Sequence, residues 1–103
     1  MKAVERKTLP MSDLSPAPYN PRSIDMAAAE ALKTSIERFG LVQEIVVNRR
    51  NNRIVGGHQR LAAMRQIGQR EVPVALVDLS DDEEKALNVA LNSPALQGEF
   101  TAD

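Results

Sequence analysis

The sequence contains no cysteine, which excludes disulfide bonds and cysteine-based metal sites. It holds a single histidine, His58, so a zinc site is not expected either. No apolar run approaches the ~20 residues that a membrane-spanning helix needs. The start, MKAVERKTLP, lacks the apolar centre of a secretory signal. We therefore expect a cytoplasmic protein with no membrane partner.

A strong charge of either sign is also missing, because the 103 residues carry a formal net charge of −1. The hydrophobic content of 43% and the charged content of 26% are ordinary for a soluble globular domain. The charge is unevenly spread, however, and an acidic cluster at 78–84 follows a basic segment. Between Ile45 and Arg70 the chain has no acidic residue and six arginines: Arg49, Arg50, Arg53, Arg60, Arg65 and Arg70. A local basic segment of this kind is suited to hold an anion.

The first half of the chain predicts an irregular strand over 3–14, a proline-rich loop over 15–22 and a helix over 26–39. Asp25 is a plausible N-cap of that helix, and Gly40 is the expected stop. Helical spacing predicts that the buried face of the helix consists of Ala28, Leu32, Ile36 and Phe39.

The second half predicts a hairpin over 44–55, a helix over 58–67 that stops at Gly68, and a central strand over 72–79. Pro73 should lie near the start of that strand. Ser80 and Glu83 form a capping box that opens a helix over 81–92. Its expected buried side is Ala86, Leu87, Ala90 and Leu91. We predict one domain over 1–92, followed by a tail or the start of a linker over 93–103.

The stretch RNNRIVGGHQRLAAM places two glycines between a short strand and a helix. The first N–H groups of a helix lack internal partners, and its dipole favours negative charge there, so this turn is suited to bind a phosphate. Arg60 lies in the first helical turn, where its guanidinium can reach phosphate oxygens, and His58 can donate a hydrogen bond or transfer a proton. The alternative is a hinge that needs Gly56 and Gly57 only for their backbone angles. The Gly-Lys-Ser/Thr ending of a P-loop is absent.

The order of motifs LSPAPYNPR, LKTSIERFGLVQEIVVN, RIVGGHQRLAAMRQIG and VPVALVDLSDDEEKALNVALN resembles the ParB/sulfiredoxin-like superfamily. The resemblance is to the branch called ParB-like nuclease domains, or ParB N-terminal domains, and covers about 8–92. It implies an α/β (α+β) fold in which a small mixed sheet packs with about three helices.

In ParB partition proteins three sequence elements line a nucleotide pocket. The first is matched here by Asn20, Pro21 and Arg22, the second by Ser35, Ile36, Gly40, Leu41, Gln43 and Ile45, and the third by Gly57, Arg60 and Ala62. The resemblance therefore implies a nucleotide site made of Asn20, Arg22, Gln43, Gly56, Gly57, His58, Gln59 and Arg60. His58 and Gln59 replace the family's Glu-Arg pair, and Glu44 replaces a usual proline. ParB proteins bind CTP with magnesium and use it to clamp on DNA.

The family's magnesium element is poorly matched, with Asn88 in place of its asparagine and Leu87 where an acid should stand. Nuclease activity is not expected, since the run Asp81–Glu84 opens a helix and should serve as a cap. Sulfiredoxins carry G-G-C-H-R at the turn; this chain lacks the thiol, so that reaction is not expected. A free-serine kinase of the superfamily carries D-G-H-H-R, which Gly57, His58 and Arg60 match.

Our interpretation is a ParB-like module that binds a nucleoside triphosphate, CTP or ATP with Mg²⁺, and has a DNA-associated or regulatory role in a phage, plasmid or partition context. The resemblance also makes nucleoside triphosphatase activity of the ParB type a candidate, with His58 and Glu44 as candidate catalytic residues. Arg49, Arg50 and Arg53 are candidates to face DNA, with weak, sequence-independent binding, and a homodimer is a further candidate assembly. The alternatives are an ATP-dependent small-molecule kinase, with Glu44 and Asp25 as possible carboxylates, and a non-catalytic interaction module with a vestigial pocket.

Overall fold

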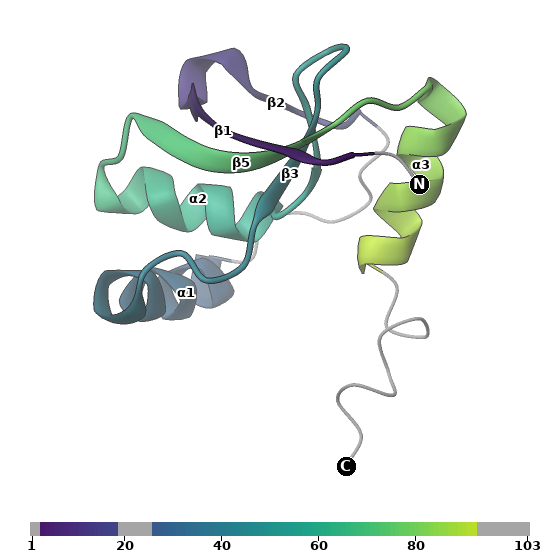
Figure 1. Cartoon of the computed structure of the whole chain (residues 1–103). Helices are drawn as coiled ribbons and strands as arrows, with labels where there is room; N and C mark the ends of the chain where they lie inside the picture. The colour runs from purple at the N-terminus through teal and green to yellow at the C-terminus, as the bar shows by residue number, and fades with distance from the viewer. Residues whose placement is uncertain (1–2, 19–25, 93–103) are drawn as a thin grey trace.

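The computed structural model describes residues 3–18 and 26–92, and its elements form one mixed sheet with helices on both faces (Figure 1). In the described part the strands are β1 (Glu5–Pro10), β2 (Ser15–Pro16), β3 (Ile45–Asn48), β4 (Arg53–Gly56) and β5 (Glu71–Val77). The helices are α1 (Met26–Phe39), α2 (His58–Ile67) and α3 (Asp81–Asn92), and a short 3₁₀ turn, η1 (Met11–Asp13), follows β1.

The strand order is β1-β5-β3-β4-β2. β5 pairs antiparallel with β1 and parallel with β3, β3 and β4 form the antiparallel hairpin, and β2 runs parallel to β4. The expected α/β class with a small mixed sheet and three helices is confirmed.

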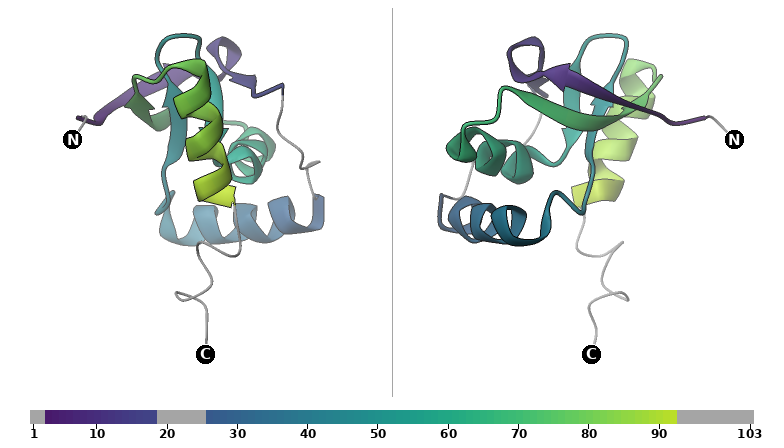
Figure 2. Two further views of the ribbon diagram at one scale, coloured as in Figure 1. Left: turned by 90° about the vertical axis from the view of Figure 1, so that its right-hand side faces the viewer. Right: turned by 60° about the vertical axis from the view of Figure 1, so that its left-hand side comes forward.

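The core lies between the sheet and α2, which covers one face, while α1 packs on the outer side of α2 and α3 lies against β4 on the opposite face (Figure 2). The sheet contributes alternating β-branched and aliphatic side chains, and α2 contributes one face of its helix. The buried cluster consists of Met11, Leu14, Ile45, Val47, Ile54, Leu61, Met64, Val72, Val74 and Leu76.

β5 is a central strand although its third residue is Pro73. The Met11 N–H donates to the Arg70 carbonyl at 2.9 Å, and the antiparallel alternation directs the backbone groups of Val74 toward β1 and those of Pro73 away from it. On the other side β3 begins only at Ile45, opposite Val74. The missing N–H of Pro73 therefore falls before the β3 ladder starts, which confirms the expected position near the start of the strand.

The predicted bounds of all three helices and the predicted hairpin are confirmed. The predicted irregular strand over 3–14 divides into β1 and η1. Gly40 and Gly68 follow their helices with φ of 87° and 95°, as helix stops. The expected capping box is present: Ser80 N–H donates to Glu83 Oε1 at 2.9 Å, and Glu83 N–H donates to Ser80 Oγ at 3.2 Å.

Two predicted buried faces are only partly right: Leu32 and Ile36 of α1 and Leu87 and Ala90 of α3 are partly buried, but other members of each face are exposed. Phe39 is the last residue of α1 and is 66% exposed. The Arg38 guanidinium lies 5.1 Å from the centre of the Phe39 ring. On α3 the fully buried residues are the polar Glu84 and Asn88, while Ala86 is exposed and Leu91 is 36% exposed. The sheet surface beneath α3 offers amide and carbonyl groups, so the helix turns hydrogen-bonding side chains toward it. Asn20, Arg22 and Asp25, and the predicted tail over 93–103, lie outside the described residues.

Candidate functional site

The turn from β4 to α2 contains two glycines, and the surrounding chain requires the second of them, Gly57. Gly57 is the N-cap of α2 with φ 93° and ψ 24°, a left-handed conformation that L side chains rarely adopt. A Cβ on Gly57 would lie 3.1 Å from Ile45 Cα, and a Cβ on Gly56 would lie 2.8 Å from Leu91 Cδ1. The two glycines thus allow β3 and α3 to approach the turn closely. Gly57 has no side chain that could cap α2. It therefore offers no side-chain acceptor to the first backbone N–H groups of the helix.

Arg60 is held in the first turn of α2 by the loop that precedes β3. Its Nη1 donates to Gln43 Oε1 at 3.0 Å, and its Nη2 donates to the Glu44 carbonyl at 3.4 Å. Its Nε is buried and has no hydrogen-bond partner in the structure. Burial lowers the pKa of Arg60 from its ordinary value, but the group stays protonated. The structure therefore brings Gln43 and Arg60 together, as the motif resemblance implied.

His58 is the first residue of α2 and is half-buried at the same turn. Its Nε2 is buried without a hydrogen-bond partner. Burial lowers the pKa of His58 from its ordinary value of 6.5, because desolvation disfavours the charged imidazolium. At neutral pH the imidazole is neutral, so its Nε2 either donates or accepts one hydrogen bond, according to the tautomer.

The lowered pKa of His58 predicts a loss of stability on acidification. Below pH 6.5 the unfolded chain takes up a proton that the folded chain resists, so the free energy of unfolding falls as the pH drops through this value. We expect His58→Gln to reduce the change in unfolding free energy between about pH 7.5 and about pH 5.5 in urea titrations. Equal pH dependence in the two proteins would show that His58 titrates as in the unfolded chain.

A buried polar network fixes the start of α3 on the β3–β4 hairpin. Glu84 is 0% exposed, and its Oε1 accepts hydrogen bonds from Asn48 Nδ2 at 2.7 Å and Asn51 Nδ2 at 3.1 Å. Its Oε2 lies 3.7 Å from Arg53 Nη1. Asn88, one turn further along α3, donates from Nδ2 to the Val55 carbonyl at 3.0 Å. The sequence prediction assigned the run Asp81–Glu84 to helix capping and missed this network.

The three arginines proposed to face DNA are all engaged with carboxylates of the chain. Arg49 Nη1 lies 3.6 Å from Glu5 Oε1, and Arg50 Nε donates to Asp78 Oδ1 at 2.6 Å. The Asp78 partner raises the pKa of Arg50 above its ordinary value. Arg53 reaches the buried Glu84. These contacts leave less unpaired positive charge on the hairpin than the sequence indicated.

The candidate catalytic and metal-binding residues are held by other contacts. The Glu44 carboxylate forms an ion pair with Arg6 of β1, and only the Glu44 carbonyl reaches the turn, through Arg60. Within 3–18 and 26–92 no group of three or more His, Asp and Glu side chains could hold a metal ion. Asn88 commits its amide nitrogen to Val55.

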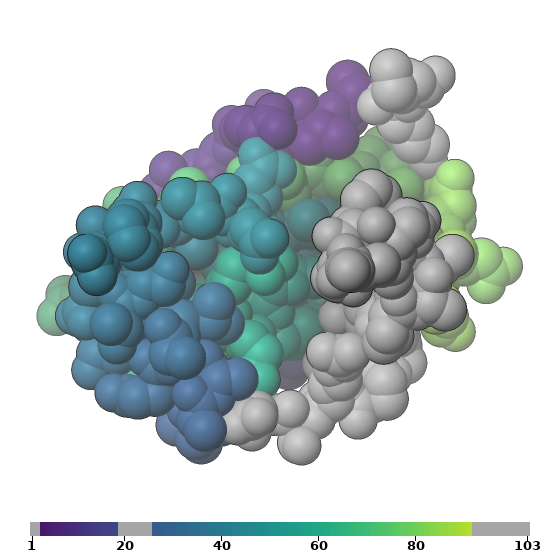
Figure 3. Space-filling view, turned by 90° about the horizontal axis from the view of Figure 1, so that it is seen from below, coloured from purple at the N-terminus to yellow at the C-terminus, as the bar shows by residue number. Residues whose placement is uncertain are grey.

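Seen from below, the surface of α2 is set back behind the larger surface of α1 (Figure 3). β4 ends at Gly56, α2 begins at His58, and Arg60 contacts Gln43, so the turn lies at the junction of β4, α2 and the loop that leads into β3. None of the helices in the described segments is long and apolar enough to span a lipid bilayer.

This fold and this turn define a domain of the ParB/sulfiredoxin-like class. A crystal structure of C-terminally truncated ParB from Caulobacter crescentus, complexed with CTP-γ-S, is similar with a TM-score of 0.76 and 22% identity, covering 96% of this chain and 66% of that one. Sulfiredoxin from Arabidopsis thaliana is similar with a TM-score of 0.68 and 19% identity, covering 81% of this chain and 96% of that one. At these identities the two likenesses concern the fold alone.

The chain belongs to the ParB N-terminal domain family, whose model matches residues 1–93. A probable chromosome-partitioning protein ParB from Campylobacter jejuni is 36% identical over 84 residues, which is 79% of this chain and 30% of that protein. The chain spans about a third of the length of the curated relatives it matches.

Proposed function

We propose that this chain is a nucleoside-triphosphate-binding module of a DNA-associated, partition-type protein, with CTP as the first candidate nucleotide. The observation that carries the proposal is the Gly57–Arg60 turn, where a helix N-terminus, an anchored guanidinium and an unpartnered imidazole nitrogen meet. The family membership supports it, and the structural neighbour from Caulobacter crescentus holds a CTP analogue in its own structure.

Each group at the turn has a separate part in binding the triphosphate. Backbone N–H groups at the start of α2 donate to phosphate oxygens, and the helix dipole favours the negative charge there. Gln43 holds the Arg60 fork in place, so its charged N–H groups lose little freedom when they bind phosphate. The neutral His58 adds a hydrogen bond without a charge. The motif resemblance assigns Asn20 and Arg22 to the same pocket, and both lie outside the described residues.

We expect Arg60→Ala to weaken triphosphate binding by ~1.5–3 kcal/mol, the range for a hydrogen bond to a charged group. The measurement is isothermal titration calorimetry with each of the four nucleoside triphosphates, with and without magnesium. Arg65→Ala is the matched control, since it removes an exposed arginine five residues further along α2. Equal affinities in the two variants would place the nucleotide elsewhere, and no binding by any nucleotide would favour an interaction module with a vestigial pocket.

Association with DNA is the second part of the proposal, and the name of the Campylobacter jejuni relative supports it. Because Arg49, Arg50 and Arg53 already face carboxylates, this segment alone should bind DNA weakly and without sequence preference. Phosphoryl transfer from ATP to a panel of small hydroxyl acceptors would instead support the kinase alternative.

A further inference from the structure

β1 forms one edge of the sheet and carries backbone groups that no described strand uses. Along β1 the backbone groups of alternate residues turn toward β5, and the Met11 N–H bond to Arg70 sets which residues these are. Lys7 and Leu9 therefore direct their N–H and C=O groups to β5. Arg6 and Thr8 direct theirs outward, away from the sheet.

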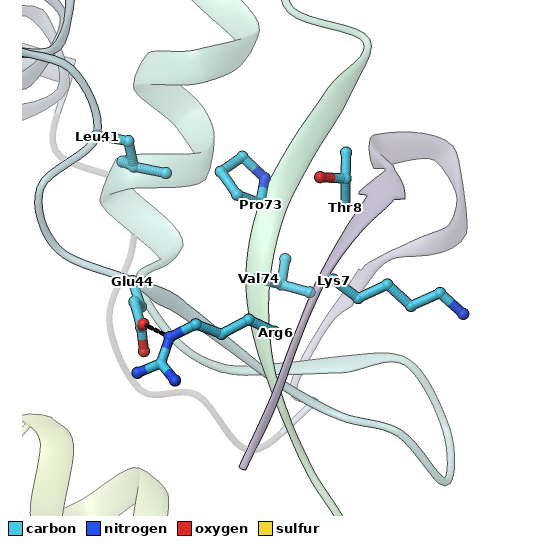
Figure 4. A pocket seen from close by; sticks show the side chains of 7 residues that line it. All are labelled: Arg6, Lys7, Thr8, Leu41, Glu44, Pro73 and Val74. Carbon is cyan, nitrogen blue, oxygen red and sulfur yellow. Dashed lines mark hydrogen bonds and ion pairs between the residues drawn. The ribbon is translucent and has the colours of Figure 1, made fainter.

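A pocket of about 460 Å³ lies beside this edge (Figure 4). Its apolar surface comes from Leu41, in the loop before β3, and from Pro73 and Val74 of β5, while β1 supplies Arg6, Lys7 and Thr8. Thr8 is paired with Pro73 in the register, so their side chains share one face of the sheet. We call this edge and its pocket the β1 groove.

The β1 groove carries positive charge that the chain neutralises only in part. The Arg6 side chain is 70% exposed and forms an ion pair with Glu44 across the pocket (Figure 4). Lys7 has no ion-pair partner among residues 3–18 and 26–92 and extends away from Glu44 in the same view. Because neighbouring strand residues point to opposite faces, each face of β1 carries one of these cations, and only Arg6 has the Glu44 carboxylate beside it.

We propose that the β1 groove binds an extended acidic segment of a partner protein, which adds to the sheet as a strand alongside β1. Unpaired N–H and C=O groups at regular spacing match another polypeptide backbone, and neither a nucleic acid nor a small anion presents that pattern. The Thr8 methyl group accepts an aliphatic side chain beside it, and the basic side chains of Arg6 and Lys7 select for carboxylates. Pro10, which has no N–H, limits the added strand to the length of Glu5–Leu9.

The geometry of β1 also predicts the spacing within the partner. The partner residues opposite Arg6 and Thr8 are two positions apart, and both side chains lie on the pocket face. An acidic residue opposite Arg6 would share its guanidinium with Glu44. An aliphatic residue opposite Thr8 would pack on the Thr8 methyl group, because Pro73 lies one strand further away. The partner segment therefore contains an acidic and an aliphatic residue separated by one residue.

The test uses a fluorescein-labelled peptide of about eight residues with the repeat Val-Thr-Glu-Thr, and fluorescence anisotropy with the full chain. A peptide with lysine in place of glutamate is the charge control. We expect the acidic peptide to bind at least about tenfold more tightly than the basic one. We also expect it to slow amide hydrogen exchange at Arg6 and Thr8 by at least about tenfold, with Lys7 and Leu9 unchanged in comparison.

Thr8→Pro and Thr8→Val form a matched pair of variants. Thr8→Pro removes an outward N–H that β5 does not use, whereas Thr8→Val keeps the N–H and nearly the same shape. We expect the proline variant alone to lose peptide binding by at least about tenfold. If Thr8→Pro does not fold, two other measurements test the proposal. They are the affinity of Arg6→Glu for the acidic peptide and the amide exchange rates of the unmodified protein with and without that peptide.

Three results would overturn the proposal. The first is equal binding of the acidic and basic peptides. The second is binding of the acidic peptide without protection of the Arg6 and Thr8 amides, which would indicate a purely electrostatic contact. The third is a dimer in analytical ultracentrifugation that Thr8→Pro abolishes, which would make a second copy of the chain the occupant of the groove.

Discussion

Glu84→Leu is expected to lower the free energy of unfolding by about 3–5 kcal/mol. The substitution removes the acceptor that Asn48 and Asn51 share and leaves Arg53 beside an apolar side chain. Asn48 is fully buried, so its amide cannot turn to water for a replacement bond. A buried ion pair replaced as a whole can be neutral, but this change removes only one member of the network.

The controls for Glu84 separate burial from charge. Asp82→Leu removes an exposed acidic residue from the same first turn of α3 and should cost no more than ~1 kcal/mol through the helix dipole. Glu84→Gln keeps an oxygen acceptor but loses the charge, so its effect should lie between those of the two leucine variants. The measurement is urea denaturation followed by circular dichroism. If Glu84→Leu and Asp82→Leu proved equally stable, the network would contribute little.

Gly57→Ala is expected to combine a loss of stability of ~2–5 kcal/mol with a loss of nucleotide binding of more than about tenfold. About 1–2 kcal/mol comes from placing an L residue in the left-handed region, and the rest from the contact of the new Cβ with Ile45. Ile45 is fully buried in β3 and the contact is with its Cα, so the turn must move rather than the strand. A shifted turn moves the N–H groups of α2 away from the proposed phosphate position.

Gly68→Ala is the matched control, because Gly68 has nearly the same φ, 95°, and open space where a Cβ would lie. This variant should show only the backbone strain and should bind nucleotide as the unmodified protein does. Thermal unfolding and calorimetric titration of both variants give the two readouts. Similar losses of stability in the two variants would mean that Ile45 accommodates the extra methyl group.

The helices were predictable because their signals are local. Gly40, Gly68 and the Ser80–Glu83 capping box mark helix ends within a few residues of sequence, and the hairpin is signalled by Asn51 and Asn52 between two β-branched runs. Asn52 has a φ of 57°, a conformation that asparagine tolerates better than most residues. The glycine turn and Arg60 were located in the same way.

The errors arose where a residue's partner lies far away in sequence. The apolar spacing of α3 indicated an alanine and leucine face, yet the helix buries Glu84 and Asn88, because it packs on Asn48 and the Val55 carbonyl. The two buried residues, one turn apart, together with the asparagines of the hairpin, are the signal that could have suggested a polar contact. The ion pairs of Arg49 and Arg50 with Glu5 and Asp78 likewise depend on the tertiary fold, which local patterns do not encode.

The pairing of β1 with β5 has a consequence for how the chain is made. Glu5 pairs with Leu76 and Pro10 with Glu71, so β1 leaves the ribosome well before its partner β5 and must wait for it. At ~5–20 residues per second, that wait is roughly 3–14 s. During this time β1 is a strand without a neighbour, which is a hazard for aggregation. Arg6, Lys7 and Pro10 are residues of the kind that suppress such association. The basic character of β1 would thus protect the nascent chain before it serves any partner of the folded domain.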